Sequence, residues 1–143
     1  MSVFPANERV DASIAGPFEA PARGAVVAEL VRMRDDERAR APFRLDQDAD
    51  VRVYSIGEGM GGDMYDYGWI EDVAGERVWE MTYGATDPAG GARKNRVFDG
   101  TVHLRAGSYI LRYRSDGSHN YGDWNDDPPD DPENWGITIY RVR

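Results

Sequence analysis

The stretch TVHLRAGSYILRYR, residues 101–114, carries the strongest structural signal in the sequence. Apolar residues alternate with polar ones over 102–104 and again over 109–113, on either side of a short turn at Gly107. Because successive side chains of a strand point to opposite faces, this pattern predicts two strands, each with one buried and one solvated face. The short turn predicts that the two strands pair with each other as an antiparallel hairpin.

Short runs of the same kind recur on both sides of this stretch. Tyr65, Tyr67 and Trp69 fall on alternate positions, which predicts three aromatic rings on one face of a strand. A glycine cluster at 57–62 is expected to end the strand before it. The remaining predicted strands are 43–45, 51–56, 79–83 and 137–143.

The N-terminal quarter of the chain is harder to interpret. Residues 25–34, AVVAELVRMR, fit both a helix stripe and a strand buried on two faces, and their β-branched content favours the strand. Residues 1–24 show no sustained periodicity and are predicted to form an extended leader.

The composition supports a β architecture. The 143 residues fit one domain, and 16 glycines and 8 prolines separate the short apolar runs. The sequence therefore predicts an all-β fold, an antiparallel two-sheet sandwich or jelly roll of seven or eight short strands, formed by a single domain over residues 25–143.

Charge and cysteine content exclude several classes of protein. A formal net charge of −9 makes nucleic acid and anionic membranes poor partners and favours cations. No apolar run is long enough to span a membrane. The chain has no cysteine, which excludes disulfides, cysteine-ligated zinc and cysteine nucleophiles.

The segment from Phe43 to Tyr113 resembles the bacterial pre-peptidase C-terminal domains, small β-sandwich modules appended to secreted enzymes. The resemblance is carried by FRL at 43–45 leading into VRV at 51–53, and by LRAGSYILR at 104–112. It implies an extracytoplasmic accessory domain, in some cases calcium-binding, that contacts a substrate or partner and performs no chemistry itself.

A long polar loop, residues 115–135, is the main candidate for a ligand-binding segment. Six carboxylates lie within 123–133 and repel one another unless cations or arginines offset them. Hard oxygen ligands suit Ca²⁺, and the predicted metal ligands are Asp123, Asn125, Asp127 and Asp130. The alternative is a loop that is solvated or paired with arginines of neighbouring strands: Arg112, Arg114 and Arg141.

Aromatic and amide side chains in the same loop indicate a second kind of site. Flat rings beside amides can stack on a sugar and hydrogen-bond its hydroxyls. The predicted ligand-binding residues are Trp124, Trp135, Tyr121, His119 and Asn120. The alternative is that both tryptophans fold inward over the end of the sandwich.

The preferred hypothesis is a non-catalytic binding or accessory module of a larger, secreted bacterial protein. It would present the 115–135 loop to Ca²⁺, a glycan or a protein. One alternative is a structural or assembly domain without a small-molecule ligand. Another is a hydrolase that depends on carboxylates or on His119. The compartment is extracytoplasmic if a signal peptide was trimmed, and otherwise cytoplasmic.

Overall fold

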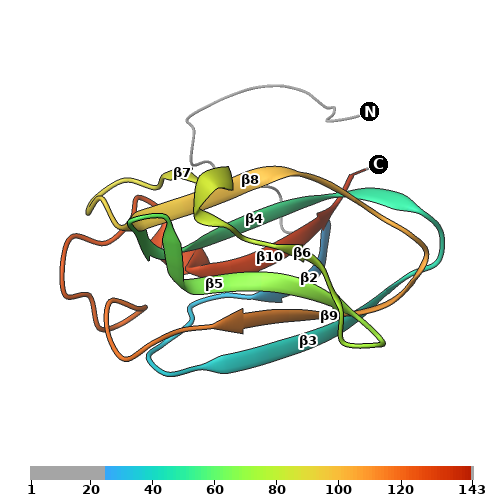
Figure 1. Cartoon of the computed structure of the whole chain (residues 1–143), viewed down its shortest axis with the longest axis horizontal. Coiled ribbons are helices and arrows are strands. Elements are labelled where there is room, and N and C mark those ends of the chain that lie inside the picture. Colours follow the sequence, from blue (N-terminus) through green and yellow to red (C-terminus); the bar gives the residue numbers. More distant parts are fainter. Residues whose placement is uncertain (1–24, 143) are drawn as a thin grey trace.

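The computed structural model describes residues 25–142 (Figure 1). The leader predicted over residues 1–24 lies outside the described part of the chain, as does residue 143. Over the described residues no helix has the length and apolar character needed to cross a membrane.

The described residues are almost entirely β-structure, with two short 3₁₀ turns, η2 (Tyr83–Ala85) and η3 (Pro132–Asn134). The nine strands are β2 (Val26–Leu30), β3 (Arg38–Leu45), β4 (Ala49–Met60), β5 (Asp63–Asp72), β6 (Arg77–Glu80), β7 (Asp87–Pro88), β8 (Asn95–Leu104), β9 (Gly107–Arg114) and β10 (Gly136–Arg141).

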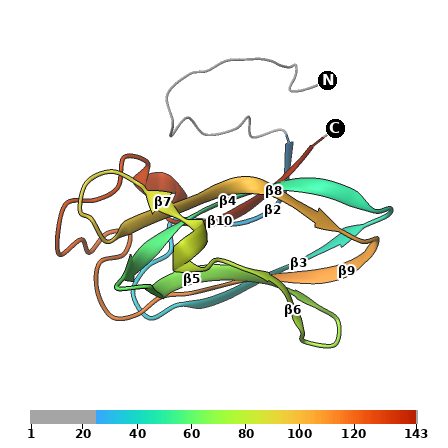
Figure 2. The ribbon, with the colours of Figure 1, turned by 45° about the horizontal axis from the view of Figure 1, so that its top comes forward.

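The strands form two antiparallel layers (Figures 1 and 2). One layer has the order β7-β8-β4-β10-β2, and the other has the order β6-β5-β9-β3. Pairing between β4 and β5 joins them into one continuous sheet. The predicted all-β antiparallel sandwich is confirmed, with a ninth strand, β7, that is only two residues long.

The interior between the layers is apolar and aromatic. Side chains with no more than 2% exposure include Val53, Ile56, Ile70, Leu111 and Ile137. Their burial removes most of their apolar surface from water, which is the main favourable term in folding. Strand β2 confirms a strand within residues 25–34, but it ends at Leu30, and only Ala28 of its five residues is buried.

Strand β4 does not end at the glycine cluster, so the prediction of a break there was wrong. It continues to Met60, and a two-residue turn of Gly61 and Gly62, both with positive φ, leads into β5. Gly57 lets β4 approach β5 closely, since a Cβ at this position would lie 2.0 Å from the carbonyl oxygen of Asp66. The glycines therefore allow β4 to pass from one layer to the other.

The predicted hairpin at 101–114 is also wrong in its pairing, although both of its strands exist. Strand β8 pairs with β4 and β7, whereas β9 pairs with β3 and β5. The link at Arg105-Ala106 therefore crosses from one layer to the other, and Asp48 accepts a hydrogen bond from its Ala106 backbone N–H at 2.8 Å. Alternation identifies a strand and its faces but carries no information about which strand lies beside it.

Candidate functional site

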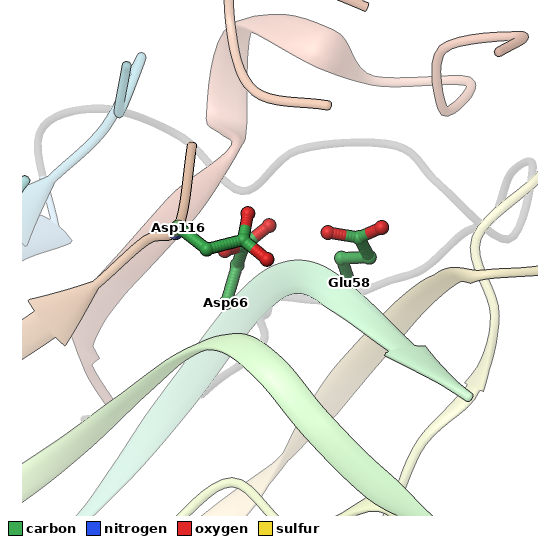
Figure 3. Close-up of side chains that lie close together, drawn as sticks. All are labelled: Glu58, Asp66 and Asp116. Atoms are coloured by element: carbon green, nitrogen blue, oxygen red, sulfur yellow. The ribbon is translucent and has the colours of Figure 1, made fainter. Parts of the chain in front are cut away.

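Three carboxylates converge where β4 crosses between the layers. Glu58 on β4 and Asp66 on β5 are register partners, and Asp116 follows the end of β9. Figure 3 shows the three carboxyl groups facing one another, and one oxygen from each lies within 4.8 Å of the others. Like charges placed opposite each other on neighbouring strands destabilise a sheet, so this arrangement requires an offsetting interaction.

Two of these carboxylates are almost completely removed from water. Asp66 has no exposed surface, and Glu58 is 7% exposed. Asp66 Oδ1 accepts the backbone N–H of Asp116 at 2.7 Å, which holds the start of the 115–135 loop against β5. The other oxygens, Asp66 Oδ2 and Glu58 Oε1, are buried without a hydrogen-bond partner. Unsatisfied buried acceptors are rare in proteins and call for a ligand or a proton.

Positive charge offsets the cluster only in part. Lys94 Nζ lies 3.2 Å from Glu58 Oε2 and donates a hydrogen bond to Asn125 Oδ1 at 2.7 Å. Burial raises the pKa of Asp66 to about 9. The neighbouring carboxyl groups of Glu58 and Asp116 also raise this pKa, whereas the hydrogen bond from the Asp116 backbone N–H lowers it. At neutral pH Asp66 therefore keeps its proton unless a cation replaces it.

The 115–135 loop is fixed beside this cluster by two buried asparagines. Asn120 Nδ2 donates to Asp35, and to the carbonyls of Asp116 and Ser118, while its Oδ1 accepts Trp135 Nε1–H at 3.0 Å. The amide of Asn120 is thus saturated by protein partners. It positions Asp116 rather than an external ligand.

Asn95 holds His119 in a similar way. Asn95 Nδ2 donates to the carbonyls of Gly90 and Asp127, so its Oδ1 accepts the Nε2–H of His119 at 2.6 Å. Burial lowers the pKa of His119, and the nearby Lys94 lowers it further, so the ring is neutral at pH 7. Its Nδ1 is then an unprotonated, buried atom without a partner.

The structure brings the predicted sugar-binding residues together but buries most of them. His119, Trp124 and Trp135 form an edge-to-face cluster with ring centroids 4.9 to 5.6 Å apart. Trp135, His119 and Asn120 have no exposed surface. They present no ring face to a glycan, because their hydrophobic and hydrogen-bonding surfaces are used inside the loop. Tyr121 and Trp124 are the two members of the set that remain partly exposed.

The predicted metal ligands do not gather into one group. Asp123, Asn125, Asp127 and Asp130 are exposed, and Asn125 Oδ1 is occupied by Lys94. Hydrogen bonding with Asp35 and the negative charge of Asp35 raise the pKa of the Asp123 carboxyl. Among residues 25–142, the three acidic side chains that lie close enough together to hold a metal are Glu58, Asp66 and Asp116.

The arginines predicted to pair with the loop lie elsewhere. Arg112 contacts Glu71 at 3.4 Å on the outer side of the second layer. Among the described residues, Glu133 of the 115–135 loop forms an ion pair with Arg32 at 3.5 Å, and both side chains are half-exposed. The loop carboxylates are therefore mainly solvated.

Sequence reasoning missed Glu58, Asp66 and Lys94 as site residues. A signal for Asp66 was present, since it alternates with the aromatic residues 65, 67 and 69 and so shares the opposite face with Gly68 and Ile70. A carboxylate on an apolar face of a strand is costly to bury. Its partners could not be found from the sequence, because Asp116 is 50 residues away.

The chain matches no protein-family profile and no curated protein sequence. The resemblance to pre-peptidase C-terminal domains therefore rests on the residues quoted above. In this chain the segment 104–112 connects two layers instead of closing a hairpin.

Proposed function

We propose that this protein is a non-catalytic β-sandwich binding module whose end is stabilised by one Ca²⁺ ion held by Glu58, Asp66 and Asp116. The observation that carries the proposal is the pair of buried, unpartnered oxygens, Asp66 Oδ2 and Glu58 Oε1, which belong to two of the three clustered carboxyl groups. This site lies beside the loop residues that the sequence predicted as metal ligands, and we propose it in their place.

The charge of the cluster supports a divalent ion. The three carboxylates carry three negative charges when ionised, and Lys94 neutralises one of them. Two negative charges remain, which matches one divalent cation. A single proton on Asp66 would neutralise only one.

The burial of Asp66 favours Ca²⁺ over Mg²⁺. Mg²⁺ requires near-ideal octahedral geometry and gives up its water ligands reluctantly, whereas Ca²⁺ accepts six to eight oxygens in irregular arrangements. A site with two buried carboxylates, Asp66 and Glu58, and a half-buried third, Asp116, requires partial dehydration of the ion. Ca²⁺ is also consistent with the extracytoplasmic accessory role that the family resemblance implies.

Thermal unfolding with and without Ca²⁺ tests the proposal. A free Ca²⁺ concentration about 100 times Kd stabilises the folded state by about 2.7 kcal/mol. For a domain of this size, that raises Tm by roughly 10 °C relative to chelator. Mg²⁺ at the same concentration is expected to give a much smaller shift. An identical Tm in chelator and in Ca²⁺ would sink the proposal.

Asp116→Asn is the sharpest variant for this experiment, because the Asp116 carboxyl has one long hydrogen bond, 3.4 Å from the Ser118 N–H. It is expected to fold and to lose most of the Ca²⁺-dependent shift. Asp63→Asn is the matched control, an exposed aspartate on the same strand as Asp66. It is expected to keep the full shift.

Acid–base hydrolysis by the same carboxylates is a second candidate, favoured by the raised pKa of Asp66. Such a role requires contact between Asp66 and a substrate, and Asp66 has no exposed surface. Turnover of a glycoside or ester library that disappears in Asp66→Asn would support it. Turnover that persists in this variant, or no turnover at all, would exclude it.

A further inference from the structure

Four arginines lie side by side on the outer face of the second layer. Along β9 the residues Tyr109, Leu111 and Tyr113 point into the core, so Arg112 and Arg114 point outward. Along β3 the exposed residues include Arg38 and Arg40. We call the patch formed by Arg38, Arg40, Arg112 and Arg114 the arginine face; its strands, β3 and β9, are neighbours in Figure 1.

The register of the sheet places these arginines directly opposite one another. Arg38 pairs with Arg114 and Arg40 pairs with Arg112, in two adjacent rows. Neighbouring strands lie about 4.8 Å apart, and same-face residues along a strand lie about 6.7 Å apart. The backbone positions of the four arginines therefore lie only a few ångströms from one another. Like charges directly opposite each other on neighbouring strands destabilise a sheet.

Few carboxylates offset this charge. Glu71 contacts Arg112 at 3.4 Å. No acidic residue among residues 25–142 forms an ion pair with Arg38, Arg40 or Arg114. The chain as a whole carries a net charge of −9, so a patch of four arginines with one acidic partner is a local exception. Charge complementarity indicates that an anionic partner covers it.

Two tyrosines of β5 border the arginine face. Tyr67 is the register partner of Arg114, and Tyr65, which is 43% exposed, precedes it on the same face. The Tyr67 ring packs against Trp69, and its hydroxyl accepts a hydrogen bond from Arg77 at 3.2 Å. Tyr65 offers an exposed ring face and a hydroxyl, which suit contact with a sugar ring. Guanidinium groups bind carboxylates through two parallel hydrogen bonds.

We propose that the arginine face, together with Tyr65, binds an acidic polysaccharide of the uronic acid class. Arg38, Arg40 and Arg114 take its carboxylates, and the Tyr65 ring contacts a sugar ring. This inference rests on the proposed binding function and names its surface and ligand. It is independent of the Ca²⁺ site at the end of the sandwich.

Two other anionic partners fit the surface less well. Single-stranded nucleic acid needs successive exposed rings for its bases. Here Tyr67 packs against Trp69 at 5.4 Å, and the Arg77 guanidinium covers Trp69 at 4.0 Å. Strand β3 is an edge strand, and an acidic peptide gains affinity by adding a strand to such an edge. A strand added there would lie beside β3 and would not cover Arg112 and Arg114, which are on the face of β9, one strand further in.

Titration of the whole chain with polygalacturonate, followed by calorimetry in chelator at about 50 mM salt, tests the proposal. The chelator is needed because polyuronates themselves bind Ca²⁺. Binding is expected to weaken at least tenfold at about 300 mM salt, since exposed charges are screened. A neutral polysaccharide of similar length is expected not to bind.

The decisive variant is Arg38→Ser/Arg40→Ser, which changes two exposed arginines without ion pairs. Its matched control is Arg93→Ser/Arg105→Ser, which alters net charge equally at exposed positions away from this face. Affinity is expected to fall at least tenfold in the first and to stay within twofold in the second. Arg38→Lys/Arg40→Lys keeps the charge and is expected to bind several-fold more weakly, because lysine cannot form the paired hydrogen bonds.

Several results would overturn the proposal. These are equal loss in the control variant, no binding at low salt, or tighter binding of a single-stranded oligonucleotide or of polyglutamate than of polygalacturonate. Concentration-dependent oligomers that disappear in Arg38→Ser/Arg40→Ser would assign the surface to the acidic loop of a second copy. Binding that survives in chelator while Tm shows no Ca²⁺ dependence would retain this inference and reject the cation site alone.

Discussion

Replacing Asp66 by asparagine is expected to remove most of the pH dependence of stability that the carboxylate cluster imposes. In the cation-free protein the pKa of Asp66 is raised to about 9, against 3.8 for an unperturbed aspartate. Between these two values the folded state holds a proton that the unfolded state has released. Stability is therefore greatest below about pH 4 and falls as pH rises towards about 9.

The size of this effect follows from the linkage between proton binding and folding. One extra bound proton lowers the free energy of unfolding by about 1.4 kcal/mol for each unit of rising pH. Between pH 5 and pH 8 the loss is about 4 kcal/mol, a large part of the stability of a typical domain. Asp66→Asn has no proton to lose. Its amide can keep accepting the Asp116 N–H and can donate to the unpartnered oxygen of Glu58.

Urea unfolding in chelator at pH 5, 6, 7 and 8, followed by tryptophan fluorescence, measures this difference. The wild type is expected to lose stability relative to Asp66→Asn at each step, whereas the Asp63→Asn control should track the wild type. With Ca²⁺ in excess the slope should flatten, because the ion displaces the proton. If wild type and Asp66→Asn show parallel pH dependence in chelator, Asp66 is ionised throughout and the account of the cluster fails.

Three further predictions concern the surroundings of the site. Asn95→Ala removes the partners of His119 and of two carbonyls, so it is expected to cost about 3 kcal/mol in urea unfolding, while Asn134→Ala, with one partly buried hydrogen bond, should cost about 1 kcal/mol or less. The imidazole resonances of His119 should titrate with a midpoint below 6.5, with stability lost on acidification through this range; a midpoint at or above 6.5 would contradict the buried neutral ring. Gly57→Ala should lower stability by about 3 kcal/mol because its Cβ would strike the Asp66 carbonyl, whereas Gly84→Ala, with open space around it, should be nearly neutral; equal effects would argue against close contact at the crossing.

The strands and their faces could be predicted from the sequence because alternation is a local property. The alternating strands β8 and β9 are present, as is β5 with its three rings on one face. The strand predicted over 79–83 is wrong in its extent, because β6 ends at Glu80 and Tyr83 begins the 3₁₀ turn η2. Strand β3 begins at Arg38, five residues earlier than expected. The first four residues of β3, RARA, are polar enough in sequence to resemble a turn. In the structure their alanines point inward and their arginines point outward.

The candidate site could be predicted only in part. The 115–135 segment was recognised as acidic and aromatic, and Asp116 and His119 lie in or beside the site. The inward-folded alternative describes Trp135, which is fully buried, whereas Trp124 stays partly exposed. The saturation of Asn120 could not be foreseen, since it depends on hydrogen bonds within the folded loop. An exposed-ring interpretation of that loop is left with Tyr121 and Trp124 alone.

The sequence by itself determined an antiparallel β-sandwich, its strand faces and its acidic character, because these follow from side-chain alternation and composition. Only the tertiary structure decided that β8 and β9 belong to different layers and that Glu58, Asp66 and Asp116 meet. It also placed two pairs of arginines opposite each other on β3 and β9, which are more than 60 residues apart in sequence. The physical reason is that long-range packing decides which strands pair. The alternation of side chains is the same in every strand, so it does not distinguish one possible neighbour from another.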